Sequence, residues 1–186
     1  MKKLCFFIIL ISLTQIAVHG QSTPVDAPSD VSTEGWNVFS QDKYEIKFPI
    51  DWAIDTSGVM GSKFFLFNKL ALQSEGFMEN INLIVQDLSA YDLDLNQYVE
   101  ISEKQITTVL TDGVILSSER KSREGIEYQQ VKFSGRQGIF NLTFEQHYFI
   151  VDKNAFVLTF TYKTEDFDAV IEISKQVMNA CKIKTG

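Results

Sequence analysis

The stretch IFNLTFEQHYFIVDKNAFVLTFTYK, residues 139–163, decides the fold because apolar and polar side chains alternate along it with a period of two. The apolar members are Phe140, Leu142 and Phe144 in its first half and Phe156, Leu158, Phe160 and Tyr162 in its second half. Such alternation is typical of strands that pack one face on a core. The DKN at 152–154 predicts a hairpin turn between the halves. We therefore predict antiparallel strands at 139–151 and 155–163, with one apolar face and one largely polar face.

Seven further segments are predicted to be strands because aromatic and β-branched residues dominate them and Asp, Pro or Gly residues separate them. They are residues 36–40, 44–48, 52–56, 63–67, 80–88, 114–121 and 126–133. We expect hairpin turns at Gly125, Gly135 and Gly138, since glycine adopts turn conformations readily. Strands joined by tight hairpins form an antiparallel sheet.

In two segments the apolar residues recur at the spacing of an amphipathic helix. The first starts at Leu95 and extends to Leu110, with Asp94 and Gln97 spaced as a capping box. Thr164 is predicted to cap the second, and Glu165 and Asp166 suit the positive end of its dipole. Its apolar stripe is Phe167, Val170, Ile171, Ser174, Val177, Met178 and Cys181. Two amphipathic helices on an antiparallel sheet predict an α+β fold.

The N-terminus has the layout of a cleavable signal peptide. Lys2 and Lys3 precede a short apolar run, and small residues precede a predicted cleavage site after Gly20. Residues 21–35 have the composition of a flexible linker, and 36–186 read as one domain. We expect the mature protein to be secreted or periplasmic, with no transmembrane segment.

Charge and cysteine content narrow the possible functions. The chain has 186 residues, with 24 acidic and 17 basic side chains. Loss of Lys2 and Lys3 leaves 15 basic residues, so the net charge goes from -7 to -9. This balance argues against nucleic acid as a partner. Cys181 is the only cysteine after residue 20, so the mature chain cannot form an internal disulfide.

The order of these elements, together with YEIKFPIDW at 44–52 and ENINLIVQDL at 79–88, resembles the PsbP family and its bacterial relatives, including DcrB-like proteins. The resemblance covers residues 36–184. It implies an α/β/α sandwich with a central antiparallel sheet of about 7–9 strands and two main helices. It implies no shared catalytic centre, and members of the family commonly act by docking onto other proteins.

The only histidine after the leader, His147, shares its strand face with Asn141, Thr143 and Glu145. A base beside a carboxylate permits an enzyme, but we favour a solvated sheet face for these four residues. No GxSxG motif is present, and Cys181 belongs to an apolar stripe. We therefore expect no catalytic site, no cofactor and no enzymatic activity.

A calcium loop is the one partial metal motif. Asp92, Asp94 and Asn96 alternate, and Glu103 stands at the twelfth position, but Gln97 occupies the place of the required glycine. A capped helix explains the same residues better, so we predict no metal site.

The segment LALQSEGFMEN, residues 70–80, places Phe77 and Met78 in a loop where polar residues are usual. One interpretation is an exposed site for a protein partner, since such side chains are enriched at interfaces. The other is a loop that folds back over the sheet edge.

We expect an exported, non-enzymatic binding or accessory domain, monomeric, that docks on a protein of the cell envelope. The alternative is a periplasmic protein that binds a small ligand or a calcium-type metal ion, with a site around His147.

Overall fold

The computed structural model describes residues 34–69, 77–165 and 169–185. The predicted leader and almost all of the predicted linker lie outside these residues. The strands are β1 (Asn37–Ser40), β2 (Tyr44–Phe48), β3 (Trp52–Asp55), β4 (Phe64–Asn68), β5 (Asn80–Asp87), β6 (Thr111–Arg123), β7 (Ile126–Gln137), β8 (Phe140–Val151), β9 (Asn154–Lys163) and β10 (Lys182–Ile183). The helices are α1 (Leu95–Val109), α2 (Ala169–Asn179) and the short 3-10 helix η1 (Val59–Gly61).

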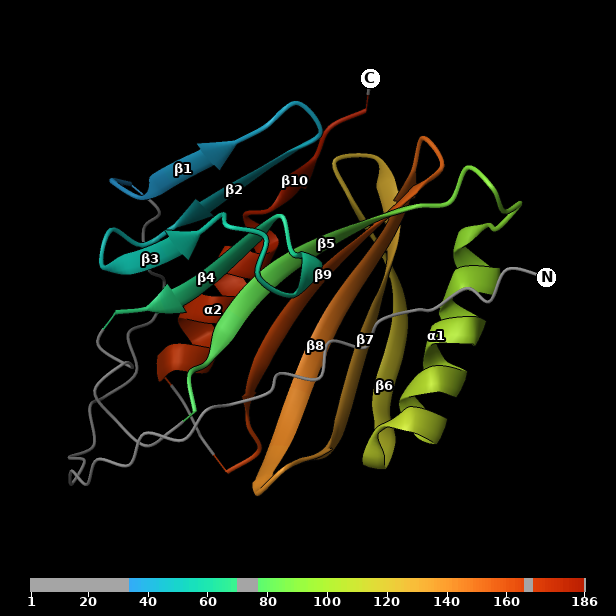
Figure 1. Cartoon of the computed structure of the whole chain (residues 1–186). Coiled ribbons are helices and arrows are strands. Elements are labelled where there is room, and N and C mark those ends of the chain that lie inside the picture. The colour runs from blue at the N-terminus through green and yellow to red at the C-terminus, as the bar shows by residue number, and fades with distance from the viewer. Residues whose placement is uncertain (1–33, 70–76, 166–168, 186) are drawn as a thin grey trace.

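Seven strands form one antiparallel sheet in the order β3-β4-β5-β9-β8-β7-β6 (Figure 1). The other three form a small sheet, β1-β2-β10, in which β10 pairs with β2 at the end of the chain. All the predicted strands are present. β10 was not predicted, because two residues are too few to show a period.

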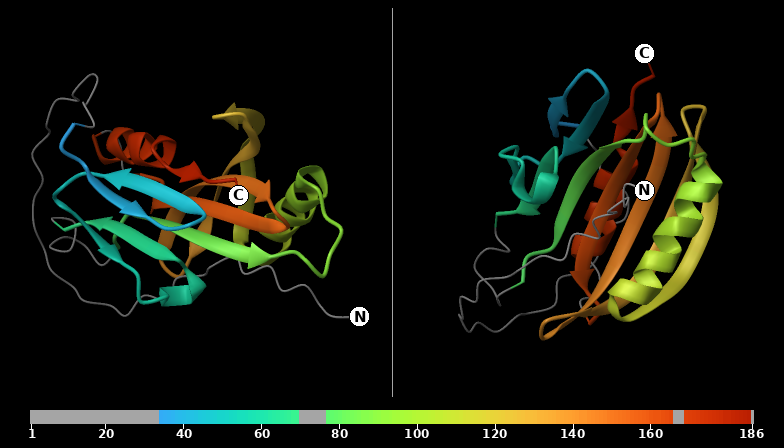
Figure 2. Two further views of the ribbon diagram at one scale, coloured as in Figure 1. Left: turned by 90° about the horizontal axis from the view of Figure 1, so that it is seen from above. Right: turned by 45° about the vertical axis from the view of Figure 1, so that its right-hand side comes forward.

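The two long helices cover opposite faces of the large sheet (Figure 2). α1 packs on β6, β7 and β8, and α2 packs on β9 and on β2 of the small sheet. We refer to these two sides of the large sheet as the α1 face and the α2 face. The predicted α+β arrangement, an α/β/α sandwich, is confirmed, with the small sheet sharing the layer of α2.

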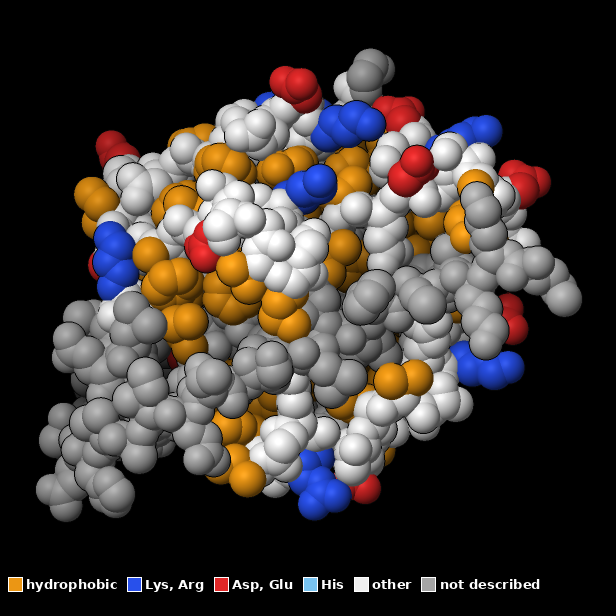
Figure 3. All heavy atoms as spheres, in the orientation of Figure 1, with side chains coloured by type: hydrophobic (Ala, Val, Ile, Leu, Met, Phe, Trp, Pro, Cys, Tyr) orange, Lys and Arg blue, Asp and Glu red, His pale blue; other side chains and the backbone are white. Residues whose placement is uncertain are grey.

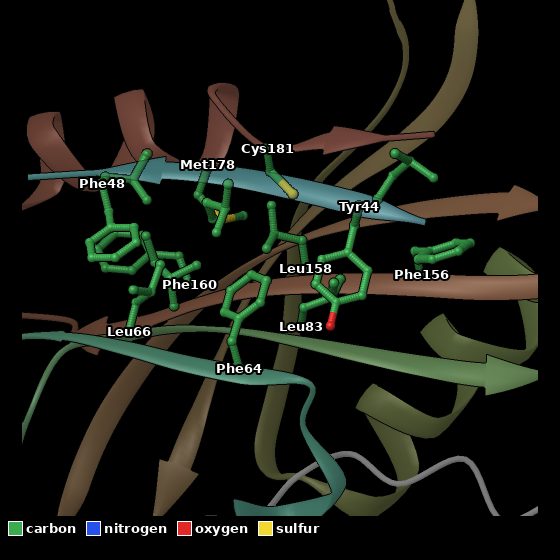
Figure 4. Packing of buried hydrophobic residues seen from close by; sticks show 14 of the residues in the cluster. Tyr44, Phe48, Phe64, Leu66, Leu83, Phe156, Leu158, Phe160, Met178 and Cys181 are labelled. Atoms are coloured by element: carbon green, nitrogen blue, oxygen red, sulfur yellow. The ribbon is translucent and has the colours of Figure 1, made fainter. Parts of the chain in front are cut away.

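The core on the α2 face is rich in aromatic side chains. Figure 4 shows Tyr44 and Phe48 of β2 and Met178 of α2 meeting Phe64 of β4 and Leu158 of β9. A second buried cluster lies under α1 and includes Tyr98 and Ile106 of that helix. β8 and β9 contribute residues to both clusters, so the large sheet is buried on both sides.

The β8–β9 hairpin turns on Asp152 and Lys153, which both have positive φ, 48° and 56°. This two-residue turn pairs Val151 with Asn154, so even-numbered residues of β8 face odd-numbered residues of β9. Glu145 therefore lies opposite Phe160. The predicted division into one apolar and one polar face is wrong: each face of the hairpin is apolar on one strand and largely polar on the other.

The capping box of α1 is confirmed. The backbone N–H of Gln97 donates to Asp94 Oδ1 at 2.9 Å, and the backbone N–H of Asp94 donates to Gln97 Oε1 at 2.9 Å. For α2, the described part of the helix begins at Ala169, and Phe167 lies outside the described residues. The Thr164 hydroxyl lies 3.1 Å from the Thr143 hydroxyl on β8.

Gly125 and Gly138 lie in hairpin turns with φ of 82° and 60°, as predicted. Gly135 does not. It lies within β7, opposite Leu142, where the Leu110 side chain approaches its Cα. A Cβ at this position would lie 2.5 Å from Leu110 Cγ, so the glycine allows a close approach and makes no turn.

Candidate functional site

Arg123, the last residue of β6, joins the edge of the large sheet to α2. Its Nη1 donates to the carbonyl oxygens of Met178 and Cys181 at 2.9 and 3.0 Å. Its Nη2 donates to Asn179 Oδ1 at 3.0 Å. A guanidinium at the C-terminal end of a helix satisfies free carbonyls and interacts favourably with the helix dipole. Arg123 therefore fixes the end of α2 against the sheet.

His147, on β8, lies between Arg123 and Glu145. Its Nδ1 is 3.5 Å from Arg123 Nη2, and its Nε2 is 3.1 Å from Glu145 Oε1. A guanidinium can only donate, so Nδ1 accepts and Nε2 carries the proton that is donated to Glu145. The ring also packs on Tyr128, with centroids 5.0 Å apart. The geometry thus defines a neutral imidazole of one tautomer.

Burial is the largest influence on His147 and lowers its pKa; the nearby charges of Arg123 and Lys121 lower it further, while Glu145 opposes the shift. For Glu145, burial alone would raise the pKa. The hydrogen bond and charge of His147, the bond from Gln130 and the charge of Lys175 outweigh burial and keep the pKa of Glu145 lowered. The pair is thus a neutral imidazole beside a carboxylate.

A polar chain extends from Glu145 to the sheet edge. Gln130 Nε2 on β7 donates to Glu145 Oε1 at 2.5 Å, and the Lys121 ammonium on β6 donates to Gln130 Oε1. The chain connects three adjacent strands, β6, β7 and β8, on the α2 face. We refer to Lys121, Arg123, Gln130, Glu145 and His147 as the ionic chain.

The structure brings only part of the predicted polar face together. Glu145 and His147 are in contact, Thr143 is buried beside Thr164, and Asn141 is exposed. The predicted solvated face is wrong, since His147 is only 1% exposed and Glu145 8%. The face is not solvated because helix α2 packs over it. The polar side chains of β8 form hydrogen bonds with one another and with side chains of neighbouring strands.

Sequence reasoning missed Arg123 and Gln130. The position of Gln130 can be predicted from strand register, because pairing β7 with β8 through the turn at Gly138 places Gln130 opposite His147. No local signal exists for Arg123, whose partners at the end of α2 and just after it lie 55 to 58 residues further along the chain.

The ionic chain has little capacity for acid–base chemistry, because both ring nitrogens of His147 have protein partners and the ring is buried. Cys181 is also buried, and burial raises the pKa of its thiol to about 12. A thiol of that pKa is not a nucleophile near neutral pH.

Phe77 and Met78 are placed differently by the structure. Phe77 is only 5% exposed and packs on Phe140 with ring centroids 5.6 Å apart. Met78 is half-buried, and its carbonyl accepts a bond from Asn80 Nδ2 at 3.1 Å. An exposed aromatic contact at Phe77 is therefore wrong. Residues 70–76 of the predicted loop lie outside the described residues, so the alternative, a loop that covers the sheet edge, stays a prediction.

Within residues 34–69, 77–165 and 169–185, no three His, Cys, Asp or Glu side chains converge in a way that could hold a metal ion. Asp94 of the partial calcium motif is engaged as the cap of α1. The same residues include no helix with the length and hydrophobicity needed to cross a bilayer.

Comparison with known proteins finds no matching family model and no matching curated protein. Solved structures do match. CyanoP, the cyanobacterial PsbP from Synechocystis sp. PCC 6803, has a TM-score of 0.60 and 14% identity over 87% of this chain and all of its own. LpqN from Mycobacterium tuberculosis, described as involved in cell envelope biogenesis, has a TM-score of 0.60 and 9% identity over 80% of this chain and 90% of its own.

A third match is PA94 from Pseudomonas aeruginosa, with a TM-score of 0.53 and 13% identity over 81% of this chain and 99% of its own. At these identities the likeness concerns the fold alone. Each of the three covers at least 80% of this chain. The resemblance seen in the sequence is thereby confirmed at the level of structure: the chain has the PsbP-like fold.

Proposed function

We propose that this protein is an exported, non-enzymatic accessory domain that docks on a protein of the cell envelope. The observation that carries the proposal is the state of the ionic chain. The pair most suited to acid–base catalysis, His147 and Glu145, is buried, and its hydrogen bonds are made within β8 and to side chains of β6 and β7. The signal-peptide pattern and the likeness to LpqN, a protein of envelope biogenesis, support the location.

Because Phe77 is buried, the docking surface has to lie elsewhere. Val109, Val114, Leu116 and Ile139 are all more than half exposed. They lie at the end of α1, the start of β6 and the β7–β8 turn, which meet at the lower end of the sheet in Figure 1. We refer to these four residues as the apolar end, and we propose that it contacts the partner.

The edge strand β6 gives this surface backbone groups as well as apolar side chains. As the last strand of the large sheet it has, within the described part of the chain, one side without a neighbouring strand, where a partner segment can add by backbone hydrogen bonds. Val38 and Ile50, near the small sheet, are also exposed but lie away from this edge. They provide a matched control.

The test is affinity capture of envelope proteins with the purified domain. We expect Val114→Asp combined with Leu116→Asp to abolish capture of a specific partner, because the partner would have to bury two carboxylates. Val38→Asp combined with Ile50→Asp should leave capture unchanged. Equal capture by both variants would reject the apolar end, and absence of any specific partner for the unmodified domain would reject docking itself.

A further inference from the structure

A short segment at the end of the chain connects α2 to the small sheet. β10 begins three residues after the end of α2 and lies beside β2, with which it forms two residue pairs (Figure 1). One more backbone hydrogen bond, from the Lys184 N–H to the Lys43 carbonyl, measures 2.9 Å. We refer to residues 180–184 as the C-terminal strap.

The outer side chains of the strap contribute little to holding it in place. Lys182 pairs with Glu124, and Lys184 Nζ lies 4.0 Å from Glu45 Oε2, with all four side chains at least a quarter exposed. Basic and acidic side chains both lie at the surface near the C-terminus, at the top of Figure 3. Surface ion pairs of this kind add little stability. A segment with so few bonds opens locally more easily than the strands of the large sheet.

Arg123 connects the strap to the large sheet. Its Nη1 donates to the carbonyls of Met178, in the last turn of α2, and of Cys181, in the strap. Its guanidinium lies over the Tyr128 ring, 5.0 Å from the centroid. Arg123 is half-buried and ends the edge strand β6, so its side chain can move outward into water without displacing a strand.

His147 determines whether Arg123 can keep this position. The neutral ring presents the Nδ1 lone pair to Arg123 Nη2 at 3.5 Å, whereas a protonated ring presents an N–H and a positive charge. The ring is only 1% exposed, packs on Tyr128 and belongs to a strand that is paired on both sides. On protonation, the guanidinium at the edge of the sheet is therefore the group that moves.

Other charged and titratable groups around His147 do not remove this repulsion. They are Lys121 of β6, Tyr128 of β7, Glu145 of β8, Lys175 of α2 and Cys181 of the strap. Glu145 binds Nε2, the ring nitrogen away from Arg123, so it stabilises a protonated ring without giving Arg123 an acceptor. Lys121 and Lys175 add positive charge, and burial raises the pKa of the Cys181 thiol to about 12, which keeps the thiol neutral.

We propose that protonation of His147 releases the C-terminal strap while the large sheet stays folded. The imidazolium displaces the guanidinium, the carbonyls of Met178 and Cys181 lose their donor, and the strap opens. Opening leaves β2 with an unpaired edge, since β10 is its neighbour on that side. The device uses no residue of the apolar end, so it does not depend on the proposed docking.

The test is amide hydrogen exchange of the ¹⁵N-labelled protein between pH 7.0 and 5.0, expressed as protection factors so that the pH dependence of the exchange chemistry cancels. We expect the protection of residues 180–184 to fall at least tenfold, in step with the titration of the His147 ring signal, while the β8 and β9 amides stay better protected than the strap. Burial and the nearby cations place this titration below pH 6.5, and Glu145, whose pKa is lowered from 4.5, stays ionised.

The strap amides separate local release from an effect on the whole domain. They exchange by local opening, so a protonation that only global unfolding relieves would leave their protection unchanged. His147→Gln keeps a donor and an acceptor but does not titrate, and its strap should stay protected at both pH values. Arg123→Gln should have a poorly protected strap already at pH 7.0, with no further fall.

Arg120→Gln is the matched control. Arg120 lies on the same strand but bonds to Asn96 of α1 and Gln129 of β7, so its loss should leave the pH dependence of the strap as in the unmodified protein.

Four results would overturn the proposal: strap protection that does not fall by pH 5.0, a fall that His147→Gln retains, β8 and β9 amides that become as unprotected as the strap, or a strap that stays protected in Arg123→Gln. The dispersion of the amide signals reports whether each variant is folded. If His147→Gln is unfolded, Arg123→Gln decides, since a pH-dependent fall that persists without the guanidinium rejects the mechanism.

Discussion

Arg123 shows how much a single side chain can determine in this fold. It makes three hydrogen bonds to the end of α2, two of them to carbonyl oxygens. We predict that Arg123→Ala lowers the free energy of unfolding by about 2–3 kcal/mol, because charge-assisted bonds are lost and partly buried acceptors are left unpaired. Urea denaturation followed by circular dichroism measures this loss.

Arg136→Ala is the matched control for Arg123→Ala. Arg136 is 53% exposed and its Nε lies 3.4 Å from Asp112 Oδ2, an ion pair at the surface. Such pairs contribute at most about 1 kcal/mol. A loss for Arg136→Ala equal to that for Arg123→Ala would mean that Arg123 does not anchor α2.

His147 makes the fold sensitive to pH, with a sign that follows from its environment. Its pKa lies below the ordinary value of 6.5 because burial and the charges of Arg123 and Lys121 outweigh Glu145. Below pH 6.5 the unfolded chain therefore binds more protons than the folded one, and stability falls as the pH falls. We predict a decrease in the free energy of unfolding between pH 7.5 and 5.5 that is largely absent in His147→Gln.

Between pH 7.5 and 5.5, His147 and not Glu145 changes its contribution to the free energy of unfolding. Glu145, whose pKa is lowered from 4.5, loses its contribution only at more acidic pH. Lys175, which also interacts with Glu145, keeps its charge throughout, since its pKa is raised from 10.5. An unchanged pH dependence in His147→Gln would contradict the assignment.

The ionic chain shows which part of the candidate site can be predicted from the sequence. His147 and Glu145 were recognised as neighbours because alternate residues of a strand share a face. Their burial was not, because it depends on α2, and the ring's partner Arg123 is 24 positions away from His147. Single-sequence periodicity carries no information on such a tertiary contact.

At the scale of elements, β7 owes its close packing to Gly135. A Cβ there would come within 2.5 Å of Leu110 Cγ, at the end of α1. We predict that Gly135→Ala destabilises the fold by about 1–3 kcal/mol, as overpacking does. In a Leu110→Ala background the same substitution should cost much less, since the clashing atoms are gone.

Ser134→Ala is the control for Gly135→Ala, since Ser134 is the half-buried neighbour on the opposite face of β7. Its effect should be small and independent of Leu110. Additive effects of Gly135→Ala and Leu110→Ala in denaturant unfolding would show that the two positions do not interact.

Elements were predicted well where a period extends over several residues. β2 begins and ends at the predicted residues, and α1 begins at Leu95 behind its capping box. β6 and β7 extend further than predicted, to 13 and 12 residues, because the added residues are all polar or glycine and do not continue the apolar alternation. The prediction of a turn at Gly135 is wrong because glycine occurs both in turns and where another side chain approaches the backbone closely. Only the tertiary contact with Leu110 distinguishes the two cases.

At the scale of the whole molecule, the central hairpin explains why both faces of the sheet need a cover. The alternating apolar series of β8, from Phe140 to Phe144, and that of β9, from Phe156 to Tyr162, are both even-numbered, and a two-residue turn sends the two series to opposite faces. A turn of two residues, Asp152 and Lys153, sets this register, so the turn length and not the alternation alone decides which face each residue occupies. A helix on each face follows, and most polar residues of the two strands, among them Glu145, His147 and Thr159, are then buried as well.

Sharing of β8 and β9 between two cores predicts that the domain unfolds as one unit. Ile106 of α1 is 1% exposed in the cluster under α1, whereas Trp52 belongs to the cluster on the α2 face and Trp36 packs against it. Ile106→Ala should cost about 2–4 kcal/mol, as a large-to-small core substitution does.

Because the chain has two tryptophans, both on the α2 side, their fluorescence reports on the face that Ile106 does not touch. We predict that Ile106→Ala shifts the urea midpoint of tryptophan fluorescence as far as that of circular dichroism. Met178→Ala, in the core on the α2 face, is the reciprocal variant and should also shift both probes together. A fluorescence midpoint that stays in place while the circular dichroism midpoint moves would show that the two faces unfold separately, and that the shared strands do not couple them.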